Sequence, residues 1–180
     1  MAAPSTVSIH NLNGTFVMNK KLSDHKSINP MLKMQGIPWL VRQAAIYSDI
    51  QVKLTQYVDD EGIPRVDQLQ ISTGGVRQFE PRFMNGALIE VEIMFWGPTT
   101  GFTKYIKNTD IEDDFLKQGW IEEDDGDVIL DHTDSKTNGW SATQVWGFAV
   151  LDGERRHVRR IVSKKGNDVL TMTTVYDYKS

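Results

Sequence analysis

The sequence predicts an all-β fold, an antiparallel up-and-down barrel of about ten strands with a short helical lid between its first two strands. Residues 23–47 have the apolar spacing of helices, whereas most of the rest alternates between apolar and polar residues. Tight-turn pairs such as Asn85-Gly86 and Asp152-Gly153 join these segments by short connections, as in antiparallel hairpins. This layout is typical of a small barrel that encloses an apolar ligand. It does not say whether the ligand is carried or converted.

The domain organisation is simple, because 180 residues suffice for one barrel with a core. We expect residues 1–12 to form a disordered or extended lead-in and residues 13–180 to form a single ligand-binding barrel domain. The first strand, residues 15–18, follows an Asn13-Gly14 turn signal. The N-terminus lacks the basic and apolar regions of a secretory signal, so we expect a cytoplasmic protein.

The helical insert is expected to contain two short helices with a bend. Ser23 or Asp24 can cap the first helix, and Pro30 suits the first turn of the next segment. Gly36 and Pro38 interrupt the pattern. Apolar residues at three-to-four spacing predict that one face of the lid points into the barrel, and this face contains Met31, Met34, Trp39 and Leu40.

The remaining strands are expected in chain order, each bounded by turn residues. Gly97-Pro98 is expected to end the fifth strand, and residues 111–117 are expected to form a short helical turn. The expected strands after the lid cover residues 50–57, 66–72, 76–79, 87–96, 102–106, 128–134, 144–151, 155–163 and 169–178.

Composition excludes several classes of function. The net charge of -4 argues against a nucleic-acid partner, because no basic stripe is available to neutralise phosphates. The longest wholly apolar stretches, such as residues 93–96, are far too short to insert into a membrane. The chain has no cysteine, and its four histidines form no metal-binding pattern. We therefore expect neither a metal nor an organic cofactor, and the oligomeric state stays open.

Several motifs together resemble a family of small fungal lipocalin-like proteins, related to the fatty-acid-binding (calycin) barrels. The motifs are Asn11-Leu12-Asn13-Gly14-Thr15, Met31-Leu32-Lys33-Met34-Gln35-Gly36, Trp39-Leu40-Val41-Arg42, Thr73-Gly74-Gly75, Trp146-Gly147-Phe148 and Asp152-Gly153-Glu154-Arg155-Arg156. In size and layout the chain is similar to the hetero-Diels–Alderases of tropolonic sesquiterpene biosynthesis. The resemblance implies dehydration of a hydroxymethyl tropolone to a quinone methide, followed by cycloaddition to a humulene-type alkene.

One departure from the fatty-acid-binding pattern bears on function. Those proteins carry an inward Arg-x-Tyr in the last strand that grips a carboxylate, and the comparable stretch here is Thr174-Val175-Tyr176. Because the tyrosine is present and the arginine is absent, a plain fatty-acid carrier is less favoured unless Arg159 or Arg160 supplies the charge.

The strand at residues 155–163 offers the richest chemistry for a barrel lining. Alternation places Arg155, His157 and Arg159 on one face and Arg156 and Arg160 on the other, and the sequence does not decide which face is inside. An inward arginine would either pair with a buried carboxylate, such as residue 90 or 92, or donate to a ligand oxygen.

The other candidates follow from alternation and from the resemblance. His157 could donate a proton to a departing hydroxyl, and Trp146 with Phe148 could form a flat wall for a conjugated ring. The candidate catalytic residues are His157, Arg159, Tyr176 and Gln70. The candidate substrate-binding residues are Gln68, Trp146, Phe148, Met34, Trp39, Leu54 and Thr174.

The sequence thus predicts a fungal secondary-metabolite enzyme that binds a conjugated, apolar small molecule in a barrel cavity. Its activity is expected to be that of a cofactor-independent pericyclase. The alternatives are a non-catalytic carrier of a fatty acid or a hydrophobic pathway intermediate, and a dehydratase or isomerase. All three need the same apolar cavity.

Overall fold

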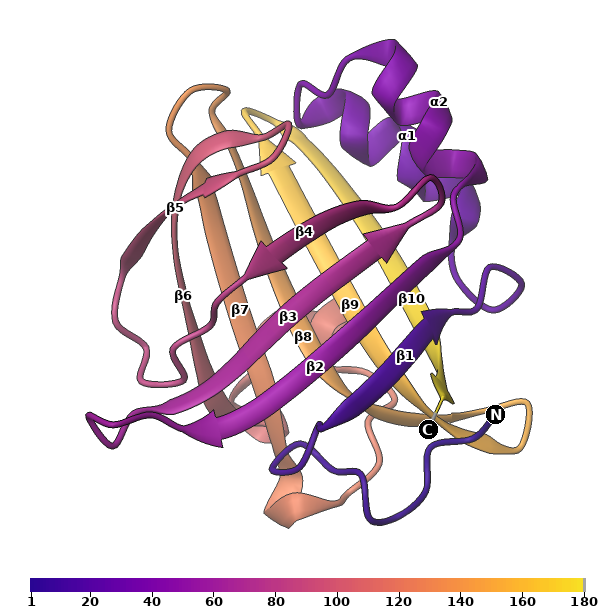
Figure 1. Cartoon of the computed structure of the whole chain (residues 1–180), viewed down its shortest axis with the longest axis vertical. Helices are drawn as coiled ribbons and strands as arrows, with labels where there is room; N and C mark the ends of the chain where they lie inside the picture. Colours follow the sequence, from indigo (N-terminus) through magenta and orange to yellow (C-terminus); the bar gives the residue numbers. More distant parts are fainter. Residues whose placement is uncertain (180) are drawn as a thin grey trace.

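The computed structural model describes residues 1–179, so Ser180, the last residue of the expected domain, lies outside the described residues. Ten antiparallel strands form one sheet that curls into a nearly closed barrel, and two helices cover one end of it (Figure 1). The predicted fold class is confirmed. We call the end under the helices the lid end and the opposite end the base.

The elements follow the predicted order. The helices are α1 (His25–Met34), α2 (Trp39–Tyr47) and α3 (Asp114–Lys117), with 3-10 turns η1 (Asn108–Asp110) and η2 (Asp124–Gly126). The strands are β1 (Gly14–Met18), β2 (Ile50–Val58), β3 (Pro64–Ser72), β4 (Val76–Glu80), β5 (Ile89–Ile93), β6 (Gly97–Lys107), β7 (Asp127–Ser135), β8 (Trp140–Leu151), β9 (Glu154–Lys165) and β10 (Asp168–Lys179).

The sheet closes through its first and last strands, because β1 pairs with both β2 and β10. The two edge strands are β4 and β5, and they are not neighbours in the sheet. Residues 82–86 bridge part of this seam. The Arg82 carbonyl accepts a hydrogen bond from the Val66 N–H at 3.0 Å, and the Gly86 N–H donates to the Thr103 carbonyl at 3.0 Å. The segment therefore connects β3 to β6.

The lid differs in detail from the expected one. A single helix, α1, includes Pro30, and the break comes later, where Gly36 has a φ of +85° and Pro38 precedes α2. Neither Ser23 nor Asp24 caps α1 with its side chain. Instead, the Ser23 hydroxyl and the Asp24 carboxylate accept the N–H groups of Val175 and Thr173, each at a distance below 3 Å. Both side chains thereby provide hydrogen-bond acceptors for the backbone N–H groups of β10 that lie beyond the end of β1.

The first twelve residues have no helix or strand, but they are not a loose lead-in. Ala3, Val7, Ile9 and Leu12 are buried in the apolar core at the base, against side chains such as Phe16. The Ala3 N–H also donates to the Arg155 carbonyl at 2.8 Å. A barrel of this width leaves an open end that apolar side chains can fill, and here the N-terminal segment fills it.

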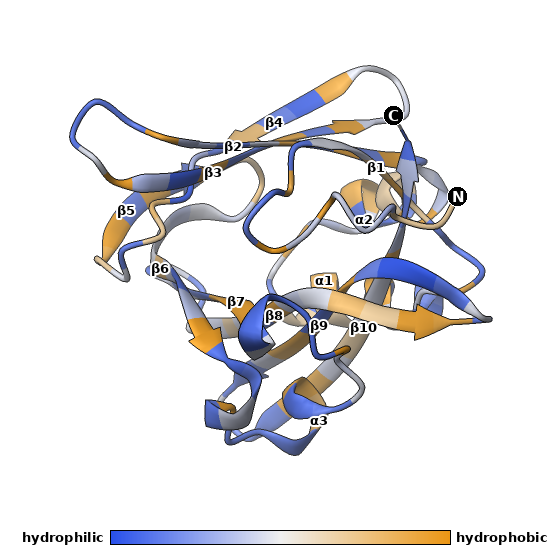
Figure 2. Ribbon diagram, turned by 90° about the horizontal axis from the view of Figure 1, so that it is seen from below, coloured by the Kyte–Doolittle hydropathy of each residue, from blue (hydrophilic) through white to orange (hydrophobic). Residues whose placement is uncertain are grey.

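A second core lies on the outside of the barrel, where the connection between β6 and β7 folds back over β8 and β9 (Figure 2). Its members include Leu116 of α3 and Val162, with Trp120 packed against them. Gly147 is required beneath Trp120, because a Cβ there would lie 2.6 Å from the indole. The strands β8 and β9 are therefore covered on both faces.

The turn between β5 and β6 comes earlier in the chain than the sequence predicts. The turn comprises Met94–Trp96, and Gly97 and Pro98 already belong to β6, paired with β5. Pro98 is tolerated because it lies at the start of β6, before the pairing with β7 begins at Thr99. Along residues 1–179, no helix is long and apolar enough to cross a membrane.

Candidate functional site

A cavity of about 250 Å³ lies inside the barrel beneath the lid. Its upper walls are apolar, with contributions from the lid helix α1, from the β5–β6 turn and from the strands. These apolar residues are Met18, Ile28, Met31, Leu32, Ala45, Ile50, Ile93, Trp96, Trp140, Ala142, Ile161 and Met172. A conjugated or aliphatic molecule entering from the lid end would therefore meet apolar surface first.

The floor of the cavity is polar. The residues on it come from β3, β4 and the following loop, and from β7, β8, β9 and β10. They are Gln68, Gln70, Gln78, Glu80, Arg82, Asp131, Gln144, Arg159, Thr174 and Tyr176. Below this floor the apolar core of the base begins, so the polar groups form one layer between two apolar regions.

Arg159 is the central cation of the floor. Its guanidinium lies 3.7 Å from the centroid of the Trp146 ring, and its Nη1 donates to the Gln68 side-chain oxygen at 2.8 Å. Within residues 1–179, Arg159 forms no salt bridge and its Nη2 has no hydrogen-bond partner. Burial lowers the pKa of Arg159 from its usual value, although the group stays charged at neutral pH. An unsatisfied buried donor is costly, so a ligand oxygen would relieve it.

His157 lies directly beneath Arg159 rather than in the cavity. The ring is fully buried, with ring centroids of Phe16, Phe148 and Tyr176 within 6 Å. Its Nε2 accepts a hydrogen bond from the Arg159 Nε at 3.2 Å. Burial, with the Arg159 charge, lowers the pKa of His157 well below its usual value, so the ring is neutral at pH 7. The expected role as a proton donor to substrate is not supported, and His157 instead positions Arg159.

Arg82 forms a second charged group on the floor. Its Nη2 lies 2.6 Å from Glu80 Oε2 and its Nε lies 3.1 Å from Asp131 Oδ1. Burial alone would lower the pKa of Arg82, but the charges of Asp131 and Glu80 outweigh it and raise that pKa. Its guanidinium also lies over the Trp146 ring, 4.6 Å from the centroid.

Five of the sequence-predicted residues meet at the floor: Arg159, Tyr176, Gln70, Gln68 and Thr174. The Thr174 hydroxyl is buried and has no partner within the described chain. The alternation of β9 and β10 brings these residues inward, because Thr174 pairs with Arg159 and Tyr176 with His157.

The other predicted residues lie elsewhere. Leu54 and Phe148 belong to the core of the base, and Trp146 supports the two arginines from below without lining the cavity. Met34 is half-buried and does not line the cavity, while Trp39 at the start of α2 is 64% exposed. Of the predicted inner face of the lid, Met31 does line the cavity, together with Leu32. The bend after α1 turns Trp39 and Leu40 outward, Leu40 being 73% exposed, and α2 contributes Ala45 instead.

The residues that the sequence did not single out include Arg82, Asp131 and Gln144. The carboxylates expected to pair with an inward arginine, Glu90 and Glu92, do not do so, and Glu90 instead pairs with Lys136 near the surface. Alternation along β8 puts Gln144 on the same face as Trp146 and Phe148, and this signal could have indicated it. The structure pairs Gln144 directly with Asp131. Across residues 1–179, no group of three or more acidic, histidine or cysteine side chains is arranged to hold a metal ion.

Two relatives match the chain over nearly its whole length. One is the probable pericyclase scpY of Mollisia scopiformis, which is 32% identical over 181 residues, covering 98% of this chain and 94% of scpY. This chain belongs to the same family. The second relative, pericyclase pydY of an Acremonium species, is 30% identical and covers 99% of this chain and 97% of pydY.

A solved structure supports the fold of this pericyclase-family chain. The fluorescent protein UnaG superposes with a TM-score of 0.58 over 93% of this chain and 97% of its own, at 11% sequence identity. At that identity the likeness concerns the calycin-type barrel alone. No protein-family model matches the sequence.

Proposed function

We propose that this protein is a pericyclase that converts a conjugated substrate inside the barrel without a metal or organic cofactor. The observation that carries the proposal is the floor of the cavity, where the buried guanidinium of Arg159, which forms no salt bridge within residues 1–179, faces apolar walls. The names of the two relatives point to the same reaction class.

Confinement would supply much of the catalysis. A cycloaddition needs two unsaturated partners held face to face, and a well-oriented pair can gain about 7–11 kcal/mol over free encounter. The apolar walls under the lid offer such a space, with Trp96 and Trp140 as flat surfaces. The lid helix is tied over it, because the Trp96 Nε1 donates to the Gln35 side-chain oxygen at 2.9 Å.

Arg159 would accelerate the reaction electronically. A donor to a conjugated carbonyl withdraws electron density from the attached π system, and it stabilises negative charge that develops on the oxygen. Gln68 and His157 hold the guanidinium in place from two sides. Gln70 and the Tyr176 hydroxyl, which accepts and donates no hydrogen bond within residues 1–179, would complete the oxygen-binding floor.

In its finer form, the proposal includes dehydration of a hydroxymethyl tropolone to a quinone methide and hetero-Diels–Alder addition to a humulene-type alkene. The Tyr176 hydroxyl replaces His157 as the candidate donor to the departing hydroxyl, because Tyr176 lines the cavity and His157 does not. The carrier of a fatty acid or pathway intermediate stays the second candidate. It is favoured by the charge of Arg159, which pairs with no carboxylate among residues 1–179 and would suit a ligand carboxylate.

The test is product analysis by mass spectrometry and chiral chromatography. Purified protein is mixed with a hydroxymethyl tropolone and a hydroxylated humulene, beside a heat-denatured control. Faster formation of a single stereoisomer by the native protein would support the proposal. Retention of the tropolone or of a fatty acid in native mass spectra, with no acceleration, would reject the cycloaddition and favour the carrier.

A further inference from the structure

The charges on the cavity floor are unevenly distributed. Arg82 is paired with two carboxylates, Glu80 and Asp131, so this group carries one negative charge in excess. Arg159 pairs with no carboxylate in the described part of the chain and carries the matching positive charge. The floor therefore offers a hydrogen-bond donor at one place and a spare acceptor at another.

One carboxylate oxygen of Asp131 accepts no hydrogen bond within residues 1–179. Its Oδ1 accepts hydrogen bonds from the Arg82 Nε at 3.1 Å and from the Thr103 hydroxyl at 2.8 Å. Its Oδ2 accepts none from any residue of the range 1–179, although the side chain is buried and lines the cavity. Glu80 differs, because Gln78 bonds to its Oε1 and Arg82 to its Oε2. The free carboxylate oxygen on the floor is thus that of Asp131.

Asp131 and Arg159 serve the same part of the cavity. On β8, Gln144 pairs with Asp131, and Trp146, two residues further on, pairs with Arg159. The two charged residues are thus diagonal neighbours across one strand, on the inner face. Arg82, which holds Asp131, and Arg159 both lie over the same Trp146 ring. One substrate head group can therefore reach both residues.

We propose that Asp131 is a specificity-determining residue whose Oδ2 accepts the hydrogen of an O–H or N–H group adjacent to the oxygen that Arg159 binds. The substrate class is then a conjugated enol, vinylogous acid or vinylogous amide, in which an acceptor oxygen and a donor hydrogen lie side by side. This inference rests on the proposed function, because it assumes that Arg159 binds the substrate oxygen. The arrangement rejects a ketone or ether without the hydrogen, since Oδ2 would face an oxygen lone pair.

The test uses two small probes, tropolone and its O-methyl ether, at a pH below the pKa of tropolone. Under this condition only tropolone carries the exchangeable hydrogen. Isothermal titration calorimetry gives the affinity of the wild type and of Asp131→Asn for each probe. The wild type is expected to prefer tropolone about tenfold or more, the usual size for a hydrogen bond to a charged group. Asp131→Asn keeps an oxygen for Arg82 and Thr103 but presents an amide to the ligand, so this preference is expected to disappear or reverse.

The matched control is Glu80→Gln, which removes one negative charge beside Arg82 and leaves Asp131 Oδ2 unchanged. It is expected to retain the preference for tropolone. Thermal unfolding shows whether each variant folds. If Asp131→Asn does not, Asp131→Glu displaces the same carboxylate by one methylene and is expected to weaken the preference.

The inference is overturned by equal wild-type affinities for the two probes, by a preference that survives in Asp131→Asn, or by binding of neither probe. These outcomes are distinguishable from failure of the proposed function. A pericyclase with a different head-group preference would still form product in the mass-spectrometric assay. A carrier would show the tropolone preference without forming any product.

Discussion

Arg159 and His157 form a pair in which the histidine acts through the arginine. The neutral ring accepts from the Arg159 Nε, so the rest of the guanidinium is turned toward Gln68 and the cavity. A protonated His157 would repel Arg159 and lose this acceptor. The orientation of the arginine therefore depends on a histidine that stays neutral.

This dependence predicts how stability changes with pH. The pKa of His157 is lowered in the folded protein. Below about pH 6.5, His157 therefore binds a proton in the unfolded chain but not in the folded protein. The free energy of unfolding should fall by up to about 1.4 kcal/mol per pH unit as the pH decreases from about 6.5 toward the lowered pKa. His157→Gln, which keeps an acceptor for Arg159, should lose this part of the dependence.

Urea unfolding at pH 6.5 and 5.5 measures the effect in both proteins. His132→Gln is a suitable control, because His132 is half-buried and forms a hydrogen bond with Thr143 outside the core. Parallel pH curves for the wild type and His157→Gln would show that the ring is not held neutral.

At the residue scale, the sequence predicted half of the floor. Alternation and the family resemblance identified Arg159, Tyr176, Gln68, Gln70 and Thr174, since strands fix the direction of every second side chain. Arg82 was missed because it follows the end of β4, where no alternation applies. The sequence left open which face of residues 155–163 is inside. In the structure, His157 and Trp146 lie on the inner face but below the cavity, because depth along a barrel is not encoded in alternation.

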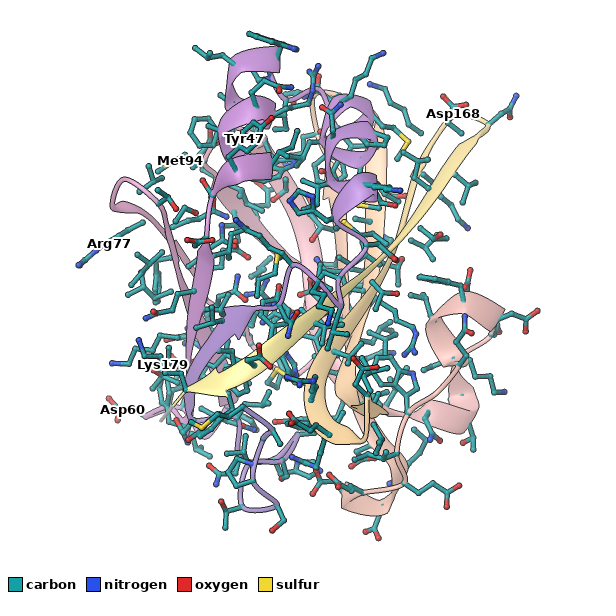
Figure 3. All side chains as sticks on the ribbon, turned by 90° about the vertical axis from the view of Figure 1, so that its right-hand side faces the viewer. Tyr47, Asp60, Arg77, Met94, Asp168 and Lys179 are labelled. Carbon is teal, nitrogen blue, oxygen red and sulfur yellow. The ribbon has the colours of Figure 1, made fainter. Side chains whose placement is uncertain are left out.

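Among the elements, the N-terminal segment differs most from what the sequence predicts. Residues 1–12 lack a regular pattern, yet their apolar side chains complete the core at the base. The termini and the β2–β3 turn at Asp60 lie at that end, away from Tyr47 and Met94 beside the lid (Figure 3). The base is thus closed by packing, and the lid end is the side on which a ligand would enter.

This closure predicts a large cost for a small change in the segment. Leu12 is fully buried, so Leu12→Ala should lower the free energy of unfolding by about 2–5 kcal/mol. Leu40→Ala, at a side chain that is 73% exposed on α2, should change it by no more than about 0.5 kcal/mol. Chemical denaturation of both variants decides the point, and similar small effects would mean that the segment is not part of the core.

The elements themselves were predicted well, because hairpin signals mark most strand ends. Helix and strand types follow from periodicity, and ten strands with two lid helices are present. The errors lie where a local signal was outweighed by the sheet. The pair Gly97-Pro98 is typical of a strand end, yet both residues belong to β6, where Pro98 pairs with Glu92 of β5.

On the scale of the whole molecule, a nearly closed barrel brings together residues that are far apart in the sequence. Gln68 and Arg159 are separated by 91 positions and still share a hydrogen bond. The sequence predicted the barrel, but the lining depends on strand register and on the depth at which the base is filled. The polar floor lies where the apolar core of the base ends, and this level sets the position of the polar groups that face the cavity.

The central claim is that an inward arginine at the cavity floor drives turnover, and the neighbouring arginine provides a control. Arg159 lies inside the barrel, whereas Arg160 lies on the outer face, where its guanidinium is 4.5 Å from the Trp120 ring centroid. The most direct measurement is the rate of product formation by Arg159→Gln and Arg160→Gln with a hydroxymethyl tropolone and a hydroxylated humulene. Arg159→Gln should lose about 100-fold or more, as for a removed oxyanion donor, and Arg160→Gln should stay within a few-fold of the wild type. Equal rates for the two variants would contradict the account.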